Sequence, residues 1–254
     1  ISFGMSECDV KAWRQGETSG YEISNSFKIN HTFKIDTLKF RIIWNYASGV
    51  QYINSVKDDY EFVLPTDNLF DLEGALIYPF GWKVDPTLAT SVNTQVTESF
   101  RISKGEKIAT SKLWDPVTSQ QTFGFEYSTF SKSDFLTSRI GISWKQIRAD
   151  KYTRLTDDFK TRDVKEKYKE QSGLSFKTNS KINLDKNTTY RGTLDLFSSF
   201  EDMTKWSVKF TNQINLKVFK AIGIVLNLNL IYDENQLAKL QYNQNLRFGL
   251  VIEP

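Results

Sequence analysis

The chain has 254 residues and a formal net charge of +3, an excess too small to argue for a nucleic-acid partner. It contains no run of about 18 apolar residues, which excludes helical membrane spans. Its single cysteine, Cys8, excludes an internal disulfide and a cysteine-based zinc site.

Residues 21–35 show the pattern that organises the whole chain. The odd positions are apolar except Asn25 and His31, whereas every even position is polar. Such an alternation has the period of an extended strand. Strands in soluble proteins usually have about five or six residues, so a strand of this length is typical of an outer-membrane β-barrel.

The same alternation recurs along the chain, and it predicts one domain over residues 1–254 with about 12 antiparallel strands. The predicted strands are 3–13, 20–35, 38–55, 68–83, 87–103, 118–130, 134–149, 166–183, 188–201, 205–218, 222–233 and 239–252. Pro79 lies inside one of them and should produce a bulge. An even strand number suits a closed transmembrane barrel.

The connections between the predicted strands sort by length onto two rims. Short turns are expected at 36–37, 84–86, 131–133, 185–187 and 219–221, and longer polar connections at 14–19, 56–67, 104–117 and 150–165. For 56–67 the alternative is a strand extension at Tyr60, Phe62 and Leu64. Outer-membrane barrels have short periplasmic turns and longer extracellular loops. We therefore expect the short turns on the periplasmic side.

The apolar faces carry bulky residues, and the polar faces carry mostly Ser, Thr, Asn, Gly and Gln. This contrast favours a lipid-facing exterior over a soluble barrel with an apolar core, which remains the alternative. Aromatic residues near strand ends are expected to form interfacial girdles, with a sugar-stacking site as the alternative. The girdle residues are Tyr21, Tyr52, Tyr78, Trp82, Trp144, Trp206, Tyr232 and Tyr242.

Basic residues outnumber acidic ones on the polar faces, and rings of Lys and Arg bias a pore toward anions. The expected lumen-lining residues are Lys28, Lys39, Arg41, Arg101, Arg139, Lys145, Lys177, Arg191, Lys209 and Arg247. They predict a small passive channel with a mildly basic lumen. The open alternative is that they pair with carboxylates on the lumen face and plug the barrel, which would then serve as a structural subunit or anchor of an envelope assembly. These carboxylates are Glu22, Asp71, Glu73, Glu126 and Asp195.

Neither catalysis nor a metal or cofactor site is expected. His31 is the only histidine, and Phe33 stands two residues later, where some outer-membrane phospholipases place a serine. The acidic pairs Asp58-Asp59 and Asp157-Asp158 lack the spacing of an EF-hand loop. We therefore expect a protein that is not an enzyme.

Several segments resemble an uncharacterised outer-membrane β-barrel family of Bacteroidota and related phyla. They are Trp13–Gly20, residues 68–100, Thr193–Phe200, the Trp206 strand, Leu228–Asp233 and Gln241–Leu250. The resemblance implies a location in the outer membrane of a Gram-negative cell, and it implies no catalytic residues. The expected partners are membrane lipid, including lipopolysaccharide, and other envelope proteins.

Overall fold

The computed structural model is all-β and describes residues 2–6, 18–55, 60–103, 106–130, 135–157, 161, 164–219, 222–233 and 237–251. Its strands are β1 (Ser2–Ser6), β2 (Thr18–Ile35), β3 (Leu38–Ser55), β4 (Tyr60–Ile77), β5 (Asp85–Thr94), β6 (Ser99–Ser103), β7 (Glu106–Ser111), β8 (Val117–Phe130), β9 (Phe135–Arg148), β10 (Tyr168–Asn183), β11 (Thr188–Ser199), β12 (Trp206–Lys217), β13 (Ile222–Asp233) and β14 (Leu237–Val251). A 3-10 turn, Thr153–Leu155, lies between β9 and β10. No helix among these residues is long and apolar enough to cross a membrane.

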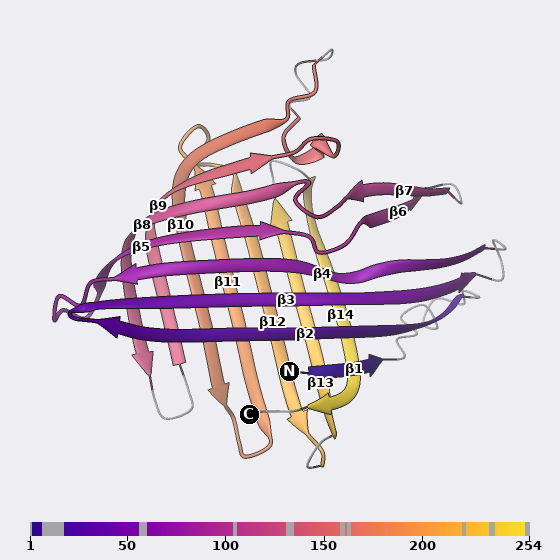
Figure 1. The fold of residues 1–254 in the computed structure, drawn as a ribbon, viewed down its shortest axis with the longest axis horizontal. Helices are drawn as coiled ribbons and strands as arrows, with labels where there is room; N and C mark the ends of the chain where they lie inside the picture. Colours follow the sequence, from indigo (N-terminus) through magenta and orange to yellow (C-terminus); the bar gives the residue numbers. More distant parts are fainter. Residues whose placement is uncertain are drawn as a thin grey trace.

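Antiparallel pairing joins the main strands in the order β1-β14-β13-β12-β11-β10-β9-β8-β5-β4-β3-β2, and β1 pairs with both β2 and β14, so the sheet closes on itself. Strands β6 and β7 form a separate hairpin. In Figure 1, β2–β5 run across the view as a front wall together with the upper parts of β8 and β9, and β11–β14 cross behind them as a back wall. Strands β8, β9 and β10 bend from one wall to the other.

Three glycines allow the sheet to turn sharply between the walls. Gly124 and Gly141 face each other in register on β8 and β9. A Cβ atom at either one would overlap backbone atoms of the other strand, and a Cβ at Gly173 on β10 would overlap the carbonyl oxygen of Ser198. Glycine at a sheet corner permits this close backbone approach.

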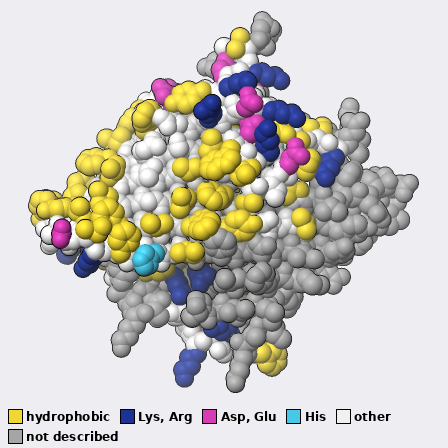
Figure 2. All heavy atoms as spheres, in the orientation of Figure 1, with side chains coloured by type: hydrophobic (Ala, Val, Ile, Leu, Met, Phe, Trp, Pro, Cys, Tyr) yellow, Lys and Arg dark blue, Asp and Glu magenta, His cyan; other side chains and the backbone are white. Residues whose placement is uncertain are grey.

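The alternation of side chains has the predicted sense at the described residues. On β9, Ile140 is 57% exposed while its neighbour Arg139 is 7% exposed; on β8, Phe123 is 66% exposed and Glu126 is 1% exposed. Hydrophobic side chains cover much of the described outer surface of the front wall in Figure 2, and charged side chains gather over the loops at its upper right. The apolar faces thus point outward and the polar faces point inward.

Two predicted segments are wrong. The strand predicted at 68–83, preceded by a connection at 56–67, is β4 at Tyr60–Ile77, so the alternative of a strand extension at Tyr60, Phe62 and Leu64 is confirmed. Its proline is Pro65, opposite Val50, where the register with β3 shifts and a missing ladder hydrogen bond is tolerated. Pro79 lies beyond β4, in a connection over 78–84 where Gly81 has a φ of 81°. The strand predicted at 87–103 ends at Thr94, and Ser99–Ser103 pairs with Glu106–Ser111 as β6 and β7.

Candidate functional site

A row of charged residues crosses the inner face of five adjacent strands. Glu126 on β8 is in register with Arg139 on β9, which is in register with Lys177 on β10. The row continues through Asp195 on β11 to Lys209 on β12. Because side chains directly opposite one another in a sheet lie on the same face, all five point into the barrel.

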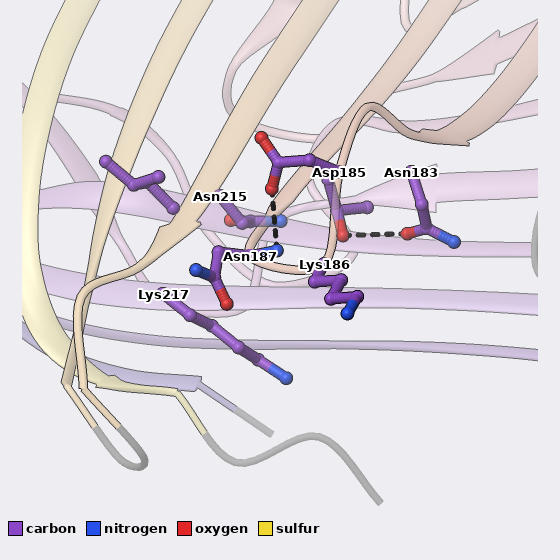
Figure 3. A pocket seen from close by; sticks show the side chains of 8 residues that line it. Asn183, Asp185, Lys186, Asn187, Asn215 and Lys217 are labelled. Carbon is purple, nitrogen blue, oxygen red and sulfur yellow. Dashed lines mark hydrogen bonds between the residues drawn. The ribbon is translucent and has the colours of Figure 1, made fainter.

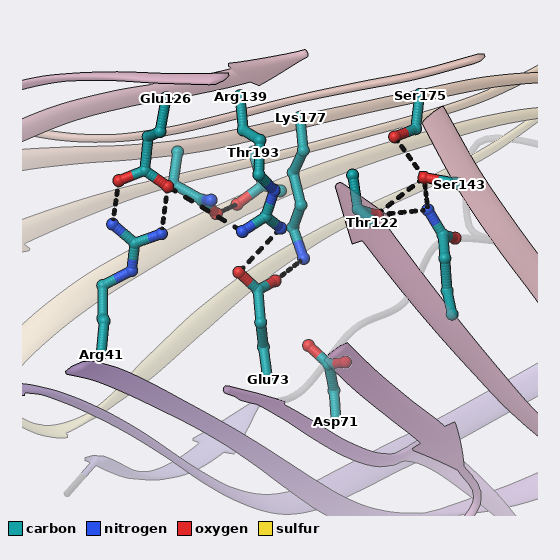
Figure 4. Close-up of polar contacts among 12 residues, drawn as sticks. Arg41, Asp71, Glu73, Thr122, Glu126, Arg139, Ser143, Ser175, Lys177 and Thr193 are labelled. Carbon is teal, nitrogen blue, oxygen red and sulfur yellow. Dashed lines mark hydrogen bonds and ion pairs between the residues drawn. The ribbon is translucent and has the colours of Figure 1, made fainter. Parts of the chain in front are cut away.

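Arg41 on β3 also points into the barrel and reaches Glu126, the residue of this row on β8. Its two terminal nitrogens each donate to one carboxylate oxygen of Glu126 at 2.5 Å, and the side chains are 4% and 1% exposed. Two strands separate these residues, and at the level of Arg41 they carry Ala75 and Ala89, both buried and in register with it. The small alanines leave room for the arginine to extend across the inner surface, and Figure 4 shows Arg41 reaching Glu126.

Glu73 forms a second centre of the same network. Its Oε1 accepts a hydrogen bond from Nη2 of Arg139 at 2.9 Å, and its Oε2 accepts one from Nζ of Lys177 at 2.5 Å. The other terminal nitrogen of Arg139 lies 3.9 Å from Glu126. We call Arg41, Glu73, Glu126, Arg139 and Lys177 the ion network, since Arg139 connects both carboxylates.

Hydroxyl groups fill the space beside the ion network. The Oγ atoms of Ser143 and Ser175 are 2.6 Å apart, and Oγ1 of Thr122 lies 2.7 Å from that of Ser143. Nε2 of Gln120 donates to Ser143 at 3.1 Å. A void of about 20 Å³ remains between these groups and the network, which is room for about one water molecule. The inner face of the front wall is therefore closely packed with paired polar groups.

The inner face of the back wall differs in its charges. By strand alternation, Lys181, Arg191 and Lys209 point inward, and none of them forms an ion pair or hydrogen bond with another described residue. Lys209 is exposed, and Lys181 and Arg191 are half-buried. Lys145, nearer the loops, has its ammonium 5.2 Å from the ring centre of Phe197. Unpaired positive charge thus lies along the back wall.

The structure places the predicted lumen residues in three different settings. Arg41, Arg139 and Lys177 belong to the ion network, and Lys39 lies 3.8 Å from Asp85. The prediction for Arg101 is wrong, because it belongs to β6, outside the barrel order. The side chains of Lys28 and Arg247 lie outside the described residues.

The sequence placed Glu73 and Glu126 on the lumen face without naming their partners. Alternation supplies the face of a residue, whereas the partner depends on how far a long side chain reaches across the sheet. Arg41 and Glu126 are 85 positions apart in the chain. No local sequence signal identifies such a pair.

Among the predicted girdle residues, Trp144 and Trp206 are 48% and 39% exposed on their strands. Tyr78 and Trp82 lie in the connection after β4, where both rings pack against Phe80, with centroid distances of 5.5 and 4.8 Å. Tyr232 is half-buried on β13. The girdle role of these residues remains a prediction. The side chains of the other three, Tyr21, Tyr52 and Tyr242, lie outside the described residues.

The loops opposite the short turns are held by buried side chains. The carboxylate of Asp115, 3% exposed, accepts hydrogen bonds from the backbone N–H groups of Asp150 and Lys151 at 2.9 Å. The hydroxyl of Tyr152 donates to Glu98 at 2.9 Å, and this bond raises the pKa of Tyr152. The segment after β9 is thereby attached to the segment before β8.

In the part of the chain that the structure describes, no three His, Cys, Asp or Glu side chains come together as a metal site would require. The pair Asp58-Asp59 and Asp158 lie outside the described residues.

No family model and no curated protein matches this chain, so the resemblance to the Bacteroidota family remains a prediction. Among solved structures, the chain is similar to the β domain of the Bordetella autotransporter BrkA, with 8% sequence identity and a TM-score of 0.27 over 98% of this chain and 94% of that one. A TM-score this low leaves the fold and the function to be argued from the strands and side chains themselves.

Proposed function

We propose that this protein is an outer-membrane β-barrel that serves as a small passive channel with a polar, mildly basic lumen. The distribution of its side chains supports the membrane assignment. Ile140 and Phe123 are exposed on the outside, where they would contact acyl chains, whereas Arg139 and Glu126 are buried in the interior. Pairing of both sheet edges satisfies the backbone groups, as lipid requires. Lipids of both leaflets, lipopolysaccharide included, would contact the apolar exterior.

The channel proposal depends on the unpaired cations of the back wall. Lys181, Arg191 and Lys209 occupy three successive strands on the inner face, and Lys209 remains exposed there. A water-filled passage along this wall would present positive charge to passing solutes. Basic residues lining a pore favour anions, so we infer weak anion selectivity.

The ion network would set the width of the passage. It neutralises most of its own charge, and with the adjacent hydroxyl groups it fills the inner face of the front wall. A barrel of about 12 strands has more interior than side chains alone must fill. The remaining space along the back wall would pass only small solutes.

The alternative function is a closed barrel that anchors or assembles with other envelope proteins. The same network supports it, because Arg41, Arg139 and Lys177 are paired within the barrel instead of facing a free aqueous path. In that case the loops that the Asp115 carboxylate joins would carry the contacts with partners.

Single-channel recording in planar bilayers separates the two functions. We expect the refolded full chain, verified by heat-modifiable migration, to give discrete conductance steps with a reversal potential that favours anions. Substituting Arg191→Glu and Lys209→Glu together should move the reversal potential toward cation selectivity, whereas Lys112→Glu, exposed in the loops, should leave it unchanged. Folded protein without conductance steps, or selectivity indifferent to the double substitution, would refute the channel.

A further inference from the structure

A recess of about 310 Å³ opens beside the turn between β10 and β11 (Figure 3). The residues that line it include Asn183, Asp185, Lys186, Asn187, Asn215 and Lys217. Asn183, Thr189 and Asn215 are in register across β10, β11 and β12, on the same inward face as Arg191. The recess therefore lies at the short-turn mouth of the barrel, on the back wall.

The turn that borders the recess is built independently of any ligand. Oδ1 of Asp185 accepts hydrogen bonds from the backbone N–H groups of Asn187 and Thr188 at 2.7 and 2.8 Å, and its Oδ2 accepts one from the Thr188 hydroxyl at 2.9 Å. The backbone N–H of Lys217 donates to the carbonyl of Asn187 at 2.8 Å, which attaches the turn to β12. Both carboxylate oxygens of Asp185 are thus used within the turn.

The groups that face the recess have a definite chemistry. Lys186 and Lys217 line the recess together with Asp185, whose carboxylate oxygens are already used within the turn. Asn215 is 8% exposed, and its carboxamide forms no hydrogen bond with a described residue. Its carboxamide is therefore open to a ligand in the recess that it lines, and Figure 3 shows it lying behind the Asp185–Asn187 turn.

We propose that the recess binds a free carboxylate next to an amide, the chemistry found at the C-terminal end of a peptide. The two lysines would hold the carboxylate, and Asn215 and Asn187 would pair with the adjoining amide. A recess of this volume has room for a terminal residue and its amide, and the rest of the peptide leaves through the open side. The inference goes beyond channel function and stands on the recess alone.

Calorimetric titration of the refolded full chain in detergent tests this proposal. The probes are N-acetyl-D-alanyl-D-alanine, N-acetyl-L-alanyl-L-alanine and the C-terminal amide of each. We expect at least one free acid to bind and its amide to bind about tenfold or more weakly, because a charge-assisted contact is lost. Preference for the D probe would identify cell-wall stem peptides as the source of the ligand, preference for the L probe protein C-termini, and equal binding any peptide carboxylate. No binding of either acid, or equal binding of acid and amide, overturns the proposal.

Two substitutions connect the binding to the recess. Asn215→Leu removes the unpaired carboxamide, and Lys186→Gln removes an exposed charge without disturbing packing; each should weaken the acid probe about tenfold. Lys34→Gln, an exposed lysine near the β2–β3 turn, serves as the control and should bind as the unaltered chain does. Should Asn215→Leu fail to show heat-modifiable migration, Lys186→Gln decides alone. Binding that the substitutions do not weaken overturns the proposal. Bilayer conductance is measured independently, so that a failure of the channel proposal is distinguished from a failure of the recess proposal.

Discussion

The substitution Glu126→Gln tests whether the ion network stabilises the barrel. It keeps the size of the side chain but removes the negative charge that both terminal nitrogens of Arg41 contact at 2.5 Å. Arg41 is 4% exposed, so its guanidinium cannot turn to water. Removing one partner of a buried ion pair costs about 3–5 kcal/mol, because the other charge stays buried and unpaired.

Urea unfolding in lipid vesicles, followed by tryptophan fluorescence, measures this loss. The matched control is Asp150→Asn, which breaks the Lys167–Asp150 ion pair at 2.6 Å, whose side chains are 63% and 77% exposed. Such an exposed pair contributes little to stability, because solvent screens the two charges. If Glu126→Gln lowers the free energy of unfolding no more than the control does, the network is not a source of stability and the reasoning fails.

Three further predictions concern the corner, the loops and one turn. Gly124→Ala should lower the free energy of unfolding by at least about 1–3 kcal/mol, because the new methyl group overlaps the Ile140 carbonyl. The control Gly74→Ala should leave the free energy of unfolding unchanged, because the nearest atom to its new methyl group is 3.8 Å away. Equal urea midpoints for the two variants would contradict the corner argument. Asp115→Ala should expose the segment after β9 to limited proteolysis, since its carboxylate holds the N–H groups there; an unchanged cleavage rate would show that other contacts hold the segment. Hydrogen bonds from the side chains of Thr204 and Lys205 lower the pKa of Asp202 to about 2. A lowered pKa means that the stabilisation is complete above the ordinary Asp pKa of about 3.9 and is lost as the pH falls toward 2; a carboxyl NMR titration centred near 3.9 would contradict this.

The strand pattern was predictable because alternation is a local property of the chain. The predicted bounds 38–55 and 222–233 coincide with β3 and β13. Outward Ile140 and inward Arg139 follow from position parity alone, since successive side chains of a strand point to opposite faces.

The bounds of β4 were not predictable in the same way. Pro65 and the polar residues after it have the composition of a loop, and only the register shift opposite Ser48 and Val50 shows how the strand accommodates a proline. The β6–β7 hairpin was missed for a related reason. Its alternation continues that of β5, and the break at Thr94 depends on contacts such as those from Asn68 to Val96 and Thr97.

The sequence by itself determined which face of each strand meets the surroundings and which meets the interior. The choice of ionic partners was decided only by the tertiary structure. Arg41 reaches Glu126 across two intervening strands, while Lys209, in the same inner row, has no ionic partner among the described residues. The physical reason is that parity depends on neighbouring residues, whereas pairing depends on the curvature of the sheet and on which small side chains lie between.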